Sequence, residues 1–149
     1  MIIEKVVGNV KTQEKQPHHV ERVYLRSDDL LKKIQRVKTD HGNELGIRLR
    51  DAKELMDGDI LFQNEKNAII ISVIEDDVIV IKPKSINQMG DIAHQLGNRH
   101  LPAQFNGDEM IVQYDYLVEK LLEEEGVLFE RVKRKMEKAF KHIGHSHGE

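Results

Sequence analysis

Three histidines near the C-terminus carry the most evident chemistry of this 149-residue chain, which has eight histidines in all. They follow the pattern His142-x-x-His145-x-His147, with glycine and serine between them, so their imidazoles could converge on one ion. Neutral imidazole binds nickel, copper and zinc, with relative affinities that follow the Irving–Williams order. The pattern predicts transition-metal capture, although a short histidine-rich end is also compatible with a terminus whose histidines are incidental.

His100 is the second candidate ligand. It follows Gly97-Asn98-Arg99, just beyond an expected helix, which places it on a loop and not in a core stripe. One imidazole does not hold a transition metal tightly, because such sites need several converging ligands. A two-fold axis would supply the second ligand by bringing His100 next to its copy. Without such a partner, His100 is expected to be a surface or hydrogen-bonding histidine.

The other histidines give weaker signals. His94 lies beside the apolar stripe of the expected helix, which favours a structural or exposed role. His41 falls in an expected hairpin turn. The adjacent pair His18-His19 follows Pro17 in a polar stretch, so both are expected to be solvated and not to ligate a metal.

Several classes of function are disfavoured by composition. The chain has no cysteine, which excludes disulfides, thiolate metal sites and cysteine nucleophiles. It has no nucleophile elbow, phosphate-binding glycine loop or His-Glu-x-x-His motif, so it is not expected to be an enzyme. A net charge of −3 argues against nucleic acid as a partner. There is no apolar run long enough to span a membrane and no signal-peptide pattern at residues 1–5, so a cytoplasmic location without membrane contact is expected.

Residues 1–74 have the pattern of a β-rich domain. Leu45, Ile47 and Leu49 alternate with other residues, as in a strand with one buried face. Asp57-Gly58-Asp59 indicates a tight turn. Short strands at this spacing predict a small antiparallel sandwich or barrel. The expected strands are residues 2–7, 20–25, 33–38, 44–49, 60–62 and 68–74.

Residues 75–140 have a different pattern, in which strands alternate with helices. A strand at 77–82 precedes a capping-box sequence, Ser85-Ile86-Asn87-Gln88, which opens a helix expected to end at Gly97. The residues expected on the buried face of this helix are Ile86, Met89, Ala93 and Leu96. A hairpin around Asn106-Gly107, a helix capped by Asp115 and a strand at 127–132 complete the series. The order β-α-β-β-α-β predicts a ferredoxin-like domain, so the whole chain is expected to be α+β. Residues 141–149 are expected to form a flexible tail.

The run Met89-Gly90-Asp91-Ile92-Ala93-His94-Gln95-Leu96-Gly97-Asn98-Arg99-His100 resembles the signature of the UreE urease accessory metallochaperones, and its Gly-Asn-Arg-His end is the most specific part. The similarity continues through the turn at 57–59 and through the histidine-containing ending at 140–147. It therefore extends over essentially the whole chain.

This resemblance implies a homodimer formed through the C-terminal domains, in which His100 from both chains binds nickel at the interface. His145, His147 and also His142 would add ligands from the tail, and zinc or copper would bind the same groups. Metal can join two such dimers into a tetramer. The family delivers nickel to the urease apoprotein together with the urease accessory GTPase. The N-terminal domain is similar to peptide-binding domains of heat-shock chaperones, which implies contact with a partner protein.

This tail differs from that of some family members, which end in a long run of histidines, because it has only three. A small number of ligands implies delivery of metal and not storage. Two alternatives remain from other classes. One is a metal-independent protein-binding adaptor in urease maturation. The other is a metal-dependent hydrolase, which would need a general base near His100, such as Asp91.

Overall fold

The computed structural model describes residues 1–51 and 53–141, and the chain forms two compact units. The first unit comprises Met1–Glu75 together with Lys135–Ala139, although this last segment falls within the range 75–140 expected for the second domain. The second unit comprises Asp76–Arg134, with Phe140 and Lys141. The first unit consists mostly of strands and the second of strands and two α-helices, so the predicted α+β class is confirmed. Within the described residues no helix is long and apolar enough to cross a membrane.

The first unit contains two sheets that share one hydrophobic core. The core contains Val23 and Ile71 from one sheet and Ile47 from the other, all almost completely buried. A short 3-10 helix, η1 (Ser27–Leu31), follows one strand and contributes the buried Leu30. The three-stranded sheet has the order β1 (Ile2–Ile3), β5 (Glu44–Arg48), β4 (Ile34–Lys38), and the four-stranded sheet has the order β2 (Gly8–Asn9), β6 (Asp59–Gln63), β7 (Asn67–Val73), β3 (His19–Leu25).

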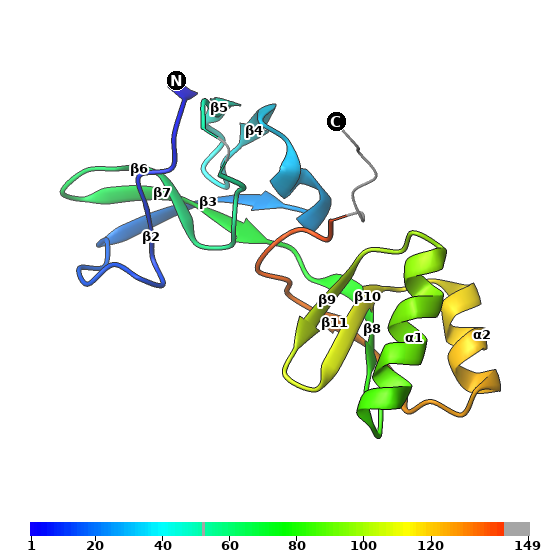
Figure 1. Cartoon of the computed structure of the whole chain (residues 1–149). Helices are drawn as coiled ribbons and strands as arrows, with labels where there is room; N and C mark the ends of the chain where they lie inside the picture. The colour runs from blue at the N-terminus through cyan, green and yellow to red at the C-terminus, as the bar shows by residue number, and fades with distance from the viewer. Residues whose placement is uncertain (52, 142–149) are drawn as a thin grey trace. The chain divides into compact units, whose positions relative to one another are not determined.

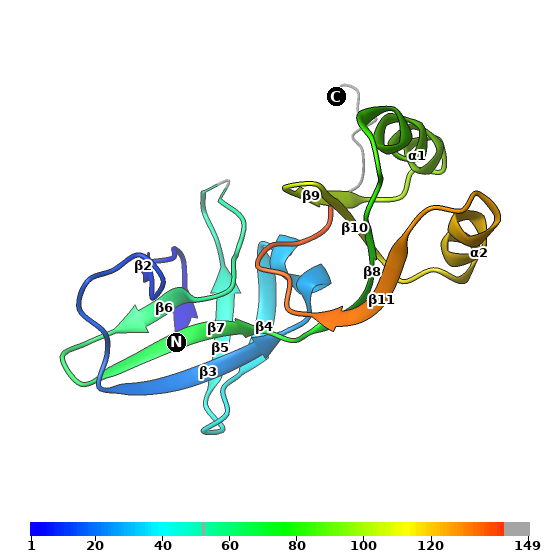
Figure 2. The same cartoon turned by 90° about the horizontal axis from the view of Figure 1, so that it is seen from below.

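Two strand pairings in the first unit are parallel, so the prediction of a purely antiparallel domain is wrong for them. β3 pairs with β7 in parallel over seven residues, from His19 opposite Asn67 to Leu25 opposite Val73. Figure 2 shows these two strands side by side. β1 pairs with β5 in the same manner. A parallel pair needs a long connection between its strands, and the chain from β3 to β7 supplies one through η1, β4, β5 and β6.

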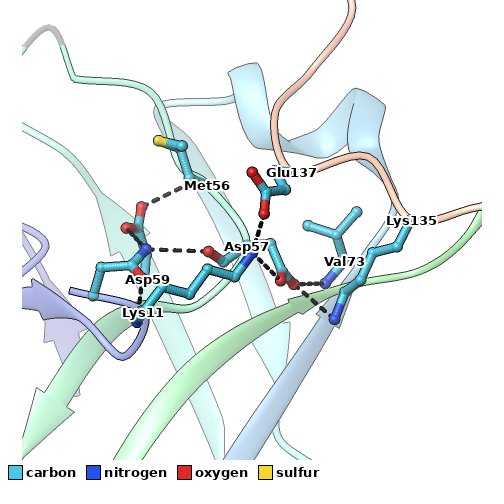
Figure 3. Close-up of polar contacts among 8 residues, drawn as sticks. Lys11, Met56, Asp57, Asp59, Val73, Lys135 and Glu137 are labelled. Carbon is cyan, nitrogen blue, oxygen red and sulfur yellow. Dashed lines mark hydrogen bonds and ion pairs between the residues drawn. The ribbon is translucent and has the colours of Figure 1, made fainter. Parts of the chain in front are cut away.

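The turn at 57–59 anchors the late segment Lys135–Ala139 to the first unit (Figure 3). The buried carboxylate of Asp57 accepts a hydrogen bond from the Val73 amide at 2.8 Å and lies 3.0 Å from the ammonium groups of both Lys11 and Lys135. The amide of Asp57 donates to the backbone oxygen of Glu137 at 2.9 Å. Residues that come after Arg134 in the sequence therefore complete the first unit.

The electrostatics of this turn favour an ionised Asp57. Burial acts to raise the pKa of its carboxyl, but the Val73 amide and the ammonium groups of Lys11 and Lys135 outweigh burial and hold the pKa below the ordinary 3.8. Gly58 lies between the two aspartates with φ 87°, a conformation that favours glycine. A Cβ at this position would also stand 2.9 Å from the side-chain oxygen of Asn9.

The second unit has the predicted ferredoxin-like order of elements. Its sheet is antiparallel throughout, with the strand order β11-β8-β10-β9. Figure 1 shows the two helices side by side on one face of this sheet. Ile92 and Leu96 of the first helix and Leu122 of the second are fully buried in their shared core. The elements are β8 (Asp76–Ile81), α1 (Ile86–Asn98), β9 (Ala103–Asn106), β10 (Glu109–Gln113), α2 (Tyr116–Glu124) and β11 (Phe129–Arg134).

Local capping starts α1 where the sequence predicts. The hydroxyl of Ser85 accepts a hydrogen bond from the Gln88 amide at 3.0 Å. The Gln88 side chain accepts from the Lys84 amide at 2.8 Å, whereas in a capping box it would accept from the amide of Ser85 itself. The buried face differs from the prediction, because Ile86 is 89% exposed and Ile92 is buried. Ile86 is the first residue of the helix, ahead of the turns that pack on the sheet.

Candidate metal-binding site

The backbone around His100 ends α1 in a Schellman motif. The helix continues one residue past Gly97, where the sequence predicts its end. His100 donates its amide to the Gly97 oxygen at 2.9 Å, and Leu101 donates to the Leu96 oxygen at 3.2 Å. These are the two hydrogen bonds that define the motif, and they place His100 at the position that adopts the left-handed conformation. Its φ is 59°, and it is the one non-glycine residue with positive φ in the part of the chain that the structure describes.

The second helix of the same unit ends in the same motif with a glycine. Gly126, with φ 67°, donates to the Glu123 oxygen at 3.2 Å, and Val127 donates to the Leu122 oxygen at 3.0 Å. Glycine has no Cβ and adopts this conformation without strain, whereas another L-residue loses about 1–2 kcal/mol there. His100 thus occupies a glycine position. Strain of this kind persists where the surrounding structure enforces it, and it is concentrated at functional sites.

Packing of the residues before and after His100 holds its backbone in place while its side chain stays exposed. Leu96 is fully buried in the core of the second unit, and Leu101 packs against the same core from the other side of the motif. The backbone on both sides of His100 is therefore fastened, and the imidazole is presented at the end of a 13-residue helix. The carboxyl end of a helix carries partial negative charge, which favours a cation.

The neighbouring polar side chains of α1 have partners on the helix itself. Nε2 of His94 lies 3.4 Å from Nδ2 of Asn98, one turn later. The Asp91 carboxylate accepts from Nε2 of Gln95 at 3.2 Å. Among residues 1–51 and 53–141, no three or more histidine, cysteine, aspartate or glutamate side chains are arranged to hold a metal ion. The described residues of one chain therefore do not assemble three such ligands around His100. His142, His145 and His147 lie outside the described residues.

A histidine pair in the first unit was not anticipated from the sequence. His19 opens β3, and its Nε2 lies 2.8 Å from Nε2 of His41, which belongs to the turn between β4 and β5. The two rings meet edge to face, with centroids 4.8 Å apart. The sequence placed His19 in a solvated polar stretch and His41 in a separate hairpin turn. Their meeting depends on the β4–β5 turn docking on β3, for which the sequence carries no local signal.

Two family models together match nearly the whole chain. The model of the UreE urease accessory protein N-terminal domain matches residues 3–74, and that of the C-terminal domain matches residues 76–149. The chain belongs to the UreE family of urease accessory proteins. The resemblance seen in the sequence is thus confirmed, and the family is named for an accessory role to urease and not for a reaction of its own.

Curated relatives agree over their full lengths. The chain is 64% identical over 147 residues to the urease accessory protein UreE of Bacillus sp. (strain TB-90), covering 99% of both chains. It is 61% identical over 147 residues to UreE of Geobacillus kaustophilus and 58% identical over 149 residues to UreE of Staphylococcus epidermidis, again with 99% of each chain covered.

Proposed function

We propose that this UreE protein is a nickel metallochaperone, which binds Ni(II) through histidines at a homodimer interface and delivers the ion to urease during assembly of its active site. The observation that carries the proposal is the left-handed backbone of His100, which holds an exposed imidazole at a position where the matching helix end has glycine. A side chain retained against about 1–2 kcal/mol of backbone strain points to a functional role for the imidazole.

In this proposal His100 from each of two chains anchors the ion on the two-fold axis. His145 and His147, with His142, add ligands from the tail of either chain. The same imidazoles would bind zinc and copper, so preference for nickel arises from metal supply and from partners. Metal bridging then joins two dimers into a tetramer. The proposed partners in the cytoplasm are the urease accessory GTPase and the urease apoprotein complex.

The proposed mechanism is ligand exchange without making or breaking of covalent bonds in a substrate. The helix end keeps one imidazole per chain fixed, and ligands from the tail come and go around the ion. The remaining positions are filled by water or by a ligand of the receiving protein, so the ion can leave without unfolding of the donor. Binding requires neutral imidazole, and protons therefore compete with the metal as the pH falls through the ordinary range of histidine, near about 6.5.

Calorimetric titration of the metal-free protein with nickel tests the site. We expect a tight phase of one ion per two chains, together with weaker binding. His100→Ala should abolish the tight phase, whereas truncation after Gly144 should keep the tight phase and remove the weaker binding. His94→Ala is the matched control, since His94 is an exposed histidine on the same helix. If His100→Ala retains the tight phase, the shared two-fold site is wrong. Activation of urease apoprotein by the nickel-loaded protein and by the nickel-loaded His100→Ala variant then tests delivery.

A metal-independent adaptor is the second candidate, and one surface feature favours it. Met1, Ile2 and Ile34 are 64%, 65% and 73% exposed, and they line a groove of about 590 Å³ on the β1-β5-β4 sheet. An apolar groove of this kind is suited to contact with another protein. The adaptor predicts that binding to the urease apoprotein complex is equally strong with nickel and with chelator. The metallochaperone predicts that urease activation is lost with chelator and with His100→Ala.

A further inference from the structure

The His19–His41 pair is a cluster of metal-ligating groups that lies in the first unit, apart in sequence from His100 and from the tail. Both side chains are exposed, and their Nε2 atoms are 2.8 Å apart. Each imidazole comes from a different supporting element, one from the start of β3 and the other from the β4–β5 turn. The two elements therefore bring the imidazoles within hydrogen-bonding distance of each other.

Asp40 fixes the orientation of His41. Its Oδ1 lies 2.7 Å from Nδ1 of His41 and also accepts the Arg22 amide at 2.9 Å. An aspartate carboxylate is ionised at neutral pH, so Asp40 can only accept hydrogen bonds. Nδ1 of His41 must then donate its proton to Asp40, and Nε2 of His41 carries the lone pair. A carboxylate that orients a histidine in this way is the usual outer partner of a metal-ligating imidazole.

The turn that carries His41 is itself pinned to β3. The Asp40 amide donates to the Arg22 oxygen at 2.8 Å. The Glu21 carboxylate accepts from the Thr39 hydroxyl and from Nδ2 of Asn43, at the two ends of the turn. These contacts bring the turn to β3 independently of the imidazoles, which means that the histidines are not needed to hold it there.

We propose that His19 and His41 form a second binding site for a divalent transition-metal ion, held by their two Nε2 atoms and completed by water. Two nitrogens cis to each other on an ion with bonds of about 2.1 Å lie about 3.0 Å apart, whereas a tetrahedral ion separates them by about 3.4 Å. The observed 2.8 Å is the hydrogen-bond separation of the metal-free pair, and a shift of a few tenths of an ångström brings the two nitrogens to either spacing. The site therefore suits Ni(II), Cu(II) or Zn(II).

Metal binding requires one change of tautomer, and both exposed rings must turn so that their Nε2 lone pairs converge on the ion instead of lying along the N–H···N line. In the metal-free pair, Nε2 of His19 donates its proton to the lone pair on Nε2 of His41. On binding, Nε2 of His19 gives that proton to water and its Nδ1 takes one from water, so the pair stays neutral overall and both Nε2 lone pairs face the ion. Since no third histidine or carboxylate among the described residues joins them, the ion keeps exchangeable water ligands, as in a site that passes metal on.

The test uses the full chain with His100, His142, His145 and His147 all replaced by alanine, which removes the ligands of the proposed function. Nickel chloride is added to the ¹⁵N-labelled protein, and amide signals are followed by NMR. We expect paramagnetic broadening centred on residues 19–22 and 39–43, with one ion bound per chain. His41→Ala should abolish this broadening, whereas His18→Ala, the adjacent exposed histidine, should leave it unchanged.

Two further variants separate metal binding from a purely structural hydrogen bond. Asp40→Asn should weaken nickel binding about 10- to 100-fold, because the orienting carboxylate is lost. His41→Gln keeps a hydrogen-bonding side chain in the turn, so it should preserve the fold, seen as unchanged dispersion of the other amide signals, and still lose the broadening. The proposal is overturned if nickel in several-fold excess broadens no signals near the pair, or if His41→Gln binds nickel as its parent does.

Discussion

Replacing His100 with glycine should stabilise the metal-free protein while it abolishes the tight phase of nickel binding. The left-handed conformation costs an L-residue about 1–2 kcal/mol, which glycine avoids. Glycine also loses about 0.5–1 kcal/mol more backbone entropy on folding. The balance for His100→Gly is a gain of about 0.5–1 kcal/mol. His100→Ala retains a Cβ at φ 59°, so it should change the free energy of unfolding by less than about 0.5 kcal/mol.

The measurement is urea unfolding of the three proteins in chelator, followed through signals of the second unit. Chelator is essential because bound nickel would stabilise only the parent protein by mass action. Gly126→Ala is the matched reverse control, since it introduces a Cβ at φ 67° in the same motif with no atom within 4 Å to clash with it. It should cost about 1 kcal/mol. If His100→Gly is less stable than His100→Ala while Gly126→Ala shows its cost, the strain argument at His100 is refuted.

Three other outcomes follow from the structure. Asp57→Asn should lower the free energy of unfolding at pH 7 and make that free energy less sensitive to acid. The lowered pKa of Asp57 gives stability that is present above about pH 3.8 and is lost as the pH falls through the pKa of the folded state. Urea unfolding at pH 7 and pH 3 measures both effects. Gly90→Ala, at an exposed position inside α1 with open space around it, should raise the free energy of unfolding by about 1 kcal/mol in the same assay, and no gain would show that the helix interior is distorted there. Nickel affinity of the parent should fall steadily between about pH 7 and pH 5.5 in calorimetric titrations, and a flat profile would exclude imidazole as the main ligand.

Local signals in the sequence predicted the elements of the second unit well. The Ser85 and Asp115 caps and the Asn106-Gly107 turn are decided by residues a few positions apart, and each was found where the sequence placed it. The end of α1 was predicted less well. Gly97 has the residue type that ends helices, but the motif places His100 instead at the left-handed position, where local stability would favour glycine.

The long-range strand pairings of the first unit could not be predicted from the sequence. The parallel pairing of β3 with β7 depends on which distant strand fits beside which, and no short pattern encodes it. The meeting of His19 and His41 follows from the same kind of packing. Nickel ligation by His100, His142, His145 and His147 stays a prediction, and the binding experiments above address it directly.

The return of Lys135–Ala139 to the first unit has a consequence for synthesis of the protein on the ribosome. The chain emerges from its N-terminus, yet the partners of Asp57 at Lys135 and Glu137 appear only after β11. The first unit therefore cannot complete its polar cluster until the strands and helices of the second unit have been made, and those elements are contiguous in sequence. The half of the protein that is translated first waits for residues that are translated after the elements of the other half.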